Sequence, residues 1–186
     1  MITLYFSPHA TSVDNEAGRA SGHADAPLSR AGEQQARALG HHYASYALDA
    51  VIASDLQRAA TTAALAFGER GLPITLDRRL RECDYGALTQ CPPAQLDELQ
   101  HITVPYPGGE SWWLAAQRVG DCLRDLFPKY DGRTLVILGH KATKYGIAYW
   151  AGDAPFGAVM RTTWEWREVP IWRYDLHAAT LAPDRC

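Results

Sequence analysis

The 186-residue sequence lacks the features that mark nucleic-acid-binding, membrane-spanning and secreted proteins. It has no run of basic residues, and its formal net charge of −3 disfavours broad binding to a nucleic-acid backbone. No stretch approaches the roughly 18 uninterrupted apolar residues of a membrane span, and no basic segment at the start indicates a signal peptide. These absences predict a cytoplasmic protein that binds neither nucleic acid nor membrane.

Disulfide and metal-site patterns are also absent. The four cysteines include no CxxC pair, so the sequence indicates neither a zinc ribbon nor a dithiol redox site. No repeat, charge block or Pro/Gly/Ser-rich linker marks a domain boundary. What is present is an ordinary globular composition, 47% hydrophobic and 21% charged, which excludes disorder. We therefore expect one domain over residues 1–186, with a core of its own.

Short β-prone apolar segments alternate with amphipathic segments along the chain. This alternation predicts an α/β fold, a three-layer sandwich with a mostly parallel central sheet flanked by helices. The expected strands are residues 2–6, 49–53, 73–76 and 134–138. The expected helices are residues 29–46 capped by Ser29, a helix from Ser54 to the glycines at 68–71, a helix from the turn 108–111 to a point before Pro128, and a helix after His140.

Two histidines follow strands in this arrangement. His9 comes a few residues after the first expected strand, and His140 comes directly after the fourth. Because ligands of open parallel sheets bind at the carboxyl ends of the strands, one pocket is expected to hold both imidazoles.

The C-terminal third is less regular and rich in aromatic residues. Residues 162–176 alternate around Trp164, Trp166, Trp172 and Tyr174, which is typical of one or two edge strands covering the core. The functional alternative is an aromatic wall over the pocket, in which an arginine meets an acidic group of the substrate. The candidate arginines are Arg161, Arg167 and Arg173.

Six short motifs occur in order between Pro8 and His140. They are PHATSVDN at 8–15, GHADAPLS at 22–29 with Gly32, Gln35 and Ala36, SDLQRA at 54–59 with Thr62 and Ala63, LRECDYG at 80–86, GGES at 108–111, and GH at 139–140. In this order they resemble the motifs of the histidine phosphatase superfamily, the phosphoglycerate-mutase-like group. The resemblance implies that family's fold and phosphoryl-transfer chemistry, without a metal or a cofactor.

The resemblance also implies roles for particular residues. A phosphoryl group in transit needs a nucleophile in line, positive charge around its oxygens and an acid at the leaving group. His9 is the expected nucleophile, Arg58 and His140 the groups that bind phosphoryl oxygens, and Glu82 the acid. Asn15 and Tyr85 match positions that contact phosphate or substrate in the family, and are expected to bind substrate here.

One position departs from the family. The arginine that precedes the first motif histidine is Pro8 in this chain, which removes a guanidinium and a backbone donor. Loss of a transition-state arginine costs about 10³ to 10⁵ in rate in other phosphoryl-transfer enzymes. Lys141 and Lys144 follow His140 and could supply a replacement cation, with Lys141 as the expected ligand-binding residue. The usual role of such lysines is on a solvated helix face.

The function predicted is a metal-independent phosphatase of small phosphomonoesters that acts through a phosphohistidine, with weak or narrow activity. Two alternatives stay open. The pocket could use His9, Glu82 and His140 for proton transfer in a dehydration, isomerisation or cyclisation, or the chain could bind a phosphorylated ligand without catalysis. The expected partner is a small phosphorylated or acidic metabolite. The sequence leaves open the substrate's identity and the oligomeric state, including a dimer.

Overall fold

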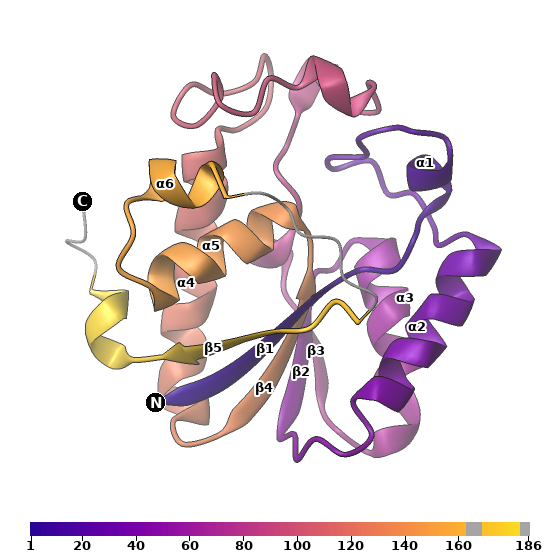
Figure 1. The fold of residues 1–186 in the computed structure, drawn as a ribbon, viewed down its shortest axis with the longest axis vertical. Coiled ribbons are helices and arrows are strands. Elements are labelled where there is room, and N and C mark those ends of the chain that lie inside the picture. The colour runs from indigo at the N-terminus through magenta and orange to yellow at the C-terminus, as the bar shows by residue number, and fades with distance from the viewer. Residues whose placement is uncertain (163–168, 183–186) are drawn as a thin grey trace.

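A central sheet organises the computed structural model, which describes residues 1–162 and 169–182 (Figure 1). Over these residues the sheet has five strands in the order β3-β2-β4-β1-β5. The first four strands along the chain run parallel to one another, and β5 runs antiparallel to β1. The strands are β1 (Ile2–Pro8), β2 (Ala50–Ala53), β3 (Ile74–Leu76), β4 (Thr134–Gly139) and β5 (Trp172–Leu176). The predicted α/β sandwich with a mostly parallel sheet is confirmed.

Helices cover both faces of this sheet. Figure 1 shows α2 (Arg30–His42) and α3 (Gln57–Phe67) on one side, and α4 (Trp112–Tyr130) and α5 (Lys141–Ala151) on the other. Two shorter helices, α1 (Val13–Glu16) and α6 (Phe156–Met160), lie outside these layers. Single turns of 3₁₀ helix occur at Gly68–Arg70, Arg78–Leu80, Gly86–Leu88, Pro93–Gln95 and Ala178–Leu181.

The sheet divides the core into two layers because successive strand residues point to opposite faces. On β4, Val136 and Leu138 pack toward the side of α2 and α3, whereas Leu135 and Ile137 pack toward the side of α4 and α5. A strand that is buried on both faces reads as a continuous apolar run, which is why β4 is evident in the sequence.

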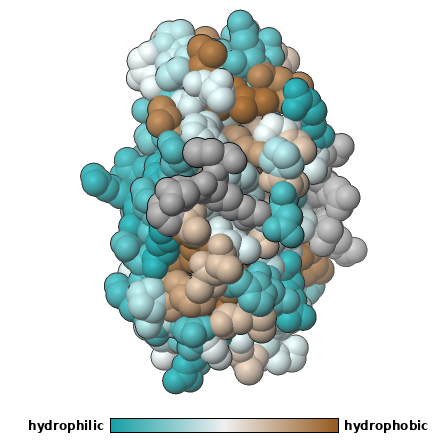
Figure 2. Space-filling view, turned by 90° about the vertical axis from the view of Figure 1, so that its left-hand side faces the viewer, coloured by the Kyte–Doolittle hydropathy of each residue, from teal (hydrophilic) through white to brown (hydrophobic). Residues whose placement is uncertain are grey.

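The outer surface is mixed in character. Figure 2 shows hydrophobic residues on one face interspersed with hydrophilic ones. Three of the exposed large apolar side chains, Leu99, Val104 and Leu114, belong to the irregular region after Pro93–Gln95 and the first turn of α4. Within the described ranges, no helix is long and apolar enough to cross a bilayer.

Helix boundaries differ from the sequence prediction at three places. Ser29 caps α2 as expected, with its Oγ accepting from the Gly32 N–H, but this helix ends at His42 rather than at residue 46. Beyond His42 the Tyr46 N–H donates to the Tyr43 carbonyl in a tighter turn, and Arg70 donates to the carbonyls of both tyrosines.

The start of α3 and the end of α4 are the other two. Gln57 begins α3, and the carboxylate of Asp25 in a distant loop accepts its N–H at 2.6 Å, so the cap comes from another segment. The helix α4 continues through Pro128 to Tyr130. The prediction that it ends before Pro128 is wrong because a proline in the last turn removes only one helical donor close to the helix end.

The short helix α1 lies where the sequence predicts no helix. A capping box holds it: Ser12 Oγ accepts from the Asn15 N–H, and Asn15 Oδ1 accepts from the Ser12 N–H. The tail prediction is confirmed for β5, which forms an edge strand against β1. Trp164, Trp166 and Arg167 lie outside the described residues.

Candidate functional site

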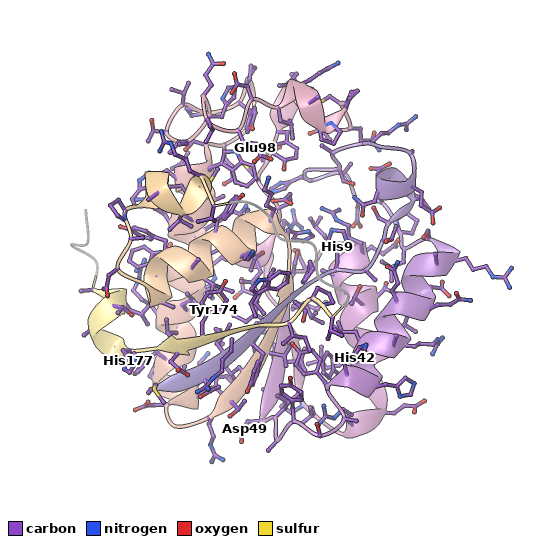
Figure 3. All side chains as sticks on the ribbon, in the orientation of Figure 1. His9, His42, Asp49, Glu98, Tyr174 and His177 are labelled. Carbon is purple, nitrogen blue, oxygen red and sulfur yellow. The ribbon has the colours of Figure 1, made fainter. Side chains whose placement is uncertain are left out.

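The ends of β1 and β4 fix the position of His9. Pro8 pairs with Gly139 in the parallel register, and the His9 N–H donates to the Gly139 carbonyl at 2.9 Å. The next residue is fixed too, because the Ala10 N–H donates to Thr62 Oγ1 at 3.0 Å. The His9 ring is therefore anchored at the carboxyl edge of the two central strands (Figure 3).

Hydrogen bonds define the tautomer of His9. Its Nδ1–H donates to the Ala10 carbonyl at 2.7 Å, which leaves the lone pair on Nε2. The Nε–H of Arg58 points at that nitrogen from 3.2 Å. Burial first, and then the charge of Arg58, lowers the pKa of His9 from 6.5 to about 3. His9 is thus a neutral imidazole at neutral pH, and its Nε2 lone pair accepts a hydrogen bond from Arg58.

Arg58 lies in the first turn of α3 and is almost fully buried. Its Nη1 donates to the Ala24 carbonyl at 2.9 Å and its Nη2 donates to the Gly22 carbonyl at 2.8 Å. Burial lowers the pKa of Arg58, and the carboxylate of Glu82 opposes this shift. The guanidinium is a fixed cation in contact with His9.

His140 faces His9 across the site, with 5.0 Å between the ring centroids. Its Nε2 is 3.0 Å from Ser54 Oγ, which also accepts from the Leu56 N–H. Its Nδ1 is buried and has no hydrogen-bond partner in the described part of the chain. Burial, followed by the charge of Arg58, holds the pKa of His140 well below 6.5. A buried nitrogen without a partner is costly, so this atom is suited to meet a ligand.

Glu82 sits at the N-terminus of α5, directly beyond His140. Its Oε1 accepts from the N–H groups of Cys83 and Ala142, at 3.0 and 2.9 Å. Its Oε2 accepts only a longer bond, 3.3 Å, from the Lys141 N–H. The N-terminus of a helix favours a carboxylate there. Oε2 is the oxygen with more freedom to exchange a proton.

The structure thus gathers His9, Arg58, Glu82 and His140 at one edge of the sheet. The other three candidates are Tyr85, Asn15 and Lys141. Tyr85 is buried beside them: a Cβ at Gly22 would be 2.9 Å from its ring. Asn15 is exposed at α1, where its side-chain oxygen is engaged in the capping box.

Lys141 is not an unpaired cation beside His9. Its ammonium donates to both carboxylate oxygens of Glu98, at 2.8 and 2.6 Å, and lies near the rings of Trp112 and Tyr145. Burial lowers its pKa, but the bond to Glu98 outweighs this and raises the pKa overall. In Figure 3, Glu98 lies above His9, in the segment that follows Pro93–Gln95. Lys144 lies over the Trp172 ring at 4.3 Å.

The two described arginines of the tail bond to their own neighbours. Arg161 donates to the Gly157 carbonyl, and Arg173 is exposed and paired with Asp175. Sequence reasoning also missed Ser54 as a partner of His140, and Arg118, which donates to the Glu82 carbonyl. Both residues could have been found from their positions near a motif. Ser54 opens the SDLQRA motif, and Arg118 lies about two helical turns after Glu110 of GGES.

Comparisons with known proteins agree with this geometry. A probable phosphoglycerate mutase, GpmB, from Salmonella choleraesuis (strain SC-B67) is 30% identical over 171 residues, covering 81% of this chain and 78% of that protein. A solved mycobacterial glucosyl-3-phosphoglycerate phosphatase, in complex with VO3, is 25% identical with a TM-score of 0.77 and covers 85% of each chain. The α-ribazole phosphatase of Shigella flexneri is 26% identical with a TM-score of 0.73, covering 84% of this chain and 83% of its own.

The family assignment rests on the length of the match as well as on the motifs. The family model described as Histidine phosphatase superfamily (branch 1) matches residues 4–181. This range takes in His9, Arg58, Glu82 and His140. The chain belongs to the histidine phosphatase superfamily.

Proposed function

We propose that this protein is a metal-independent hydrolase of small phosphomonoesters that acts through a phosphohistidine at His9. The observation that carries the proposal is the state of His9: neutral, with Nδ1–H bonded to the Ala10 carbonyl and the Nε2 lone pair facing Arg58. A nucleophile that can attack phosphorus must hold such a lone pair.

The first half-reaction uses the four gathered residues. The Arg58 Nε–H must first leave His9 Nε2 and turn to the substrate, and Glu82 must first take up a proton from solvent. His9 Nε2 then attacks phosphorus, the ester P–O bond breaks, and Glu82 gives its proton to the leaving oxygen, which departs as an alcohol. Arg58 and the Nδ1–H of His140 bind the phosphoryl oxygens, because the Ser54 hydroxyl can donate to His140 Nε2 and leave the proton on Nδ1.

The second half-reaction restores the enzyme. The Glu82 carboxylate takes a proton from water, the water oxygen attacks phosphorus, and the N–P bond breaks. Its electron pair returns to His9 Nε2, and inorganic phosphate leaves. Acid and base roles alternate on one carboxyl group, as general acid–base catalysis requires. No step needs a metal ion or a cofactor.

The class of substrate is proposed from the relatives. Those described above are named for phosphoglycerate, glucosyl-3-phosphoglycerate and α-ribazole phosphate chemistry. A small phosphorylated metabolite is therefore the proposed substrate. Pro8 stands where the motif has an arginine, so the proposed rate is low compared with a family member that carries the full motif.

The test is phosphate release from a panel of small phosphomonoesters in EDTA, with trapping of the phosphoenzyme after rapid quenching. His9→Ala is expected to lower turnover at least about 10³-fold and to abolish the trapped phosphohistidine, since it removes the nucleophile. His41→Ala, on the exposed face of α2, is the matched control and should behave as wild type.

Equal, negligible release from wild type and His9→Ala would overturn the proposal. In that case the pocket would be better explained by proton-transfer chemistry on His9, Glu82 and His140, or by binding without turnover.

A further inference from the structure

The main chain around Glu82 is held by one side chain from a different layer of the fold. Arg118 on α4 donates through Nη1 to the carbonyls of Arg79 and Arg81, both at 2.7 Å. Its Nη2 donates to the carbonyl of Glu82 itself, also at 2.7 Å. A single planar guanidinium thus spans the segment that leads into Glu82.

Glu110 fixes that guanidinium in place. Arg118 Nη2 is 2.6 Å from Glu110 Oε1, and Nε is 3.2 Å from Oε2. Both side chains are less than one-fifth exposed. Glu110 Oε1 also accepts the Asp84 N–H at 3.0 Å. The turn reaches this position because Gly109 has no side chain: a Cβ there would lie 2.2 Å from the Asp84 carbonyl oxygen.

A second donor reaches the Glu82 carbonyl from the N-terminal loop. His23 Nε2 donates to it at 2.8 Å, while His23 Nδ1 lies 3.7 Å from Asp84 Oδ2. The carboxyl group of Glu82 is bonded separately to the N-terminus of α5. The main chain of Glu82 is therefore held by Arg118 and His23, and its carboxyl group by α5 and by the N–H of the adjacent Cys83.

We infer that Arg118, held by Glu110, is a positioning residue that aims the Glu82 carboxyl at the leaving-group oxygen. The inference rests on the proposed function. None of the hydrogen bonds of Arg118 reaches His9 or Arg58, so its contact with the site runs through Glu82. Its charge is a further and smaller cause, after burial, Arg58 and His9, of the lowered pKa of His140. A displacement of a catalytic group by about 1 Å can cost roughly 10²-fold in rate.

The leaving group distinguishes positioning from general support of the fold. An alkyl phosphate needs a proton on its departing oxygen, whereas the stabilised aryl oxide of p-nitrophenyl phosphate needs little help. In Arg118→Met, kcat/KM for the best alkyl substrate should fall about 100-fold. The kcat/KM for p-nitrophenyl phosphate should stay within about 3-fold of wild type, because this ratio reports the steps up to departure of the leaving group and leaves out the attack of water, which uses Glu82 for both esters. Glu82→Gln sets the upper limit, a loss of about 10² to 10⁴ on the alkyl ester.

Two variants guard against misfolding. Glu110→Gln keeps the size of the side chain but removes the charge that pairs with the guanidinium. It should lower kcat/KM for the alkyl ester about 10-fold and leave that for p-nitrophenyl phosphate near wild type. Arg124→Met is the matched control on the same helix: Arg124 pairs with Asp121 and lies over the Trp150 ring, away from Glu82. It should leave both activities unchanged.

Selective loss on the alkyl ester in Arg118→Met and Glu110→Gln supports the inference. Equal loss on both esters would overturn it, because Arg118 would then support the whole site rather than Glu82. No loss on either ester would also overturn it. A wild type without His9-dependent turnover would remove the proposed function and this inference together, whereas the other three outcomes leave the proposed function standing.

Discussion

The two sides of the site differ in the chemical groups that they present. On the side proposed to bind phosphate, here called the phosphate side, His9, Arg58 and His140 offer one buried guanidinium and two neutral imidazoles. On the side proposed to hold the leaving group, here called the leaving-group side, Glu82 accepts three backbone N–H bonds, and the ion pairs Arg118–Glu110 and Lys141–Glu98 lie close by.

The difference shows where this chain has changed. The leaving-group side retains its motif residues and holds them rigidly, whereas the phosphate side carries Pro8 in place of an arginine. Phosphoryl transfer depends on charge stabilisation around the equatorial oxygens, so under the proposed function we expect a shortage of cations there to limit the rate more than the placement of the acid does. Variants on the phosphate side are therefore expected to have the largest effects.

The largest effect is expected from removing the guanidinium that the phosphate side retains. Arg58→Met should lower kcat/KM by about 10³ to 10⁵ on the best substrate, the range known for transition-state arginines. Calorimetric titration with inorganic phosphate should show a parallel loss of affinity. Arg37→Met, exposed on α2, is the control. A loss below about ten-fold would mean that another cation serves the phosphate, and would break the contrast between the two sides.

The next effect is a gain. Pro8→Arg adds a second guanidinium at the end of β1 and should raise kcat about 10- to 100-fold, with tighter phosphate binding. Pro8→Ala is the matched control, because it restores the backbone N–H without the charge and should leave kcat near wild type. If the alanine variant gains as much as the arginine variant, the missing charge is not what limits this site.

Sequence reasoning predicted which residues meet in two ways. His9 and His140 follow the neighbouring parallel strands β1 and β4, so their meeting follows from hydrophobic periodicity and from the rule that parallel strands end at one edge. Periodicity alone does not bring Arg58 and Glu82 to this edge. The resemblance of their motifs to those of the family placed them in the site.

The partners of those residues were not accessible in the same way. Asp25 caps α3 from 32 residues away, and Glu98 pairs with Lys141 across 43 residues. Both acidic residues lie in segments without periodicity, where side-chain contacts depend on the path of the loop. Lys141 therefore read as a spare cation in the sequence, although its charge is balanced by Glu98.

The smallest effect is a loss of folding stability at low pH, and it arises on the phosphate side. The pKa of His9 is near 3 in the folded chain and near 6.5 when unfolded. Above pH 6.5 both states are neutral, so His9 has no effect there. As the pH falls, the unfolded chain binds the proton first, so stability is lost progressively from pH 6.5 down to about 3. At about pH 5 the loss is roughly 1 kcal/mol after solvent screening, or about 2–4 °C in Tm.

Thermal unfolding at several pH values measures this loss. His9→Gln keeps a side chain of similar size without a titrating ring, so its Tm should fall less between about pH 7 and pH 5 than that of wild type. His41→Gln, exposed on α2, should follow the wild-type curve. Parallel curves for His9→Gln and wild type would show that His9 titrates as it does in the unfolded chain, and the phosphate side would then hold a second charge at mildly acidic pH.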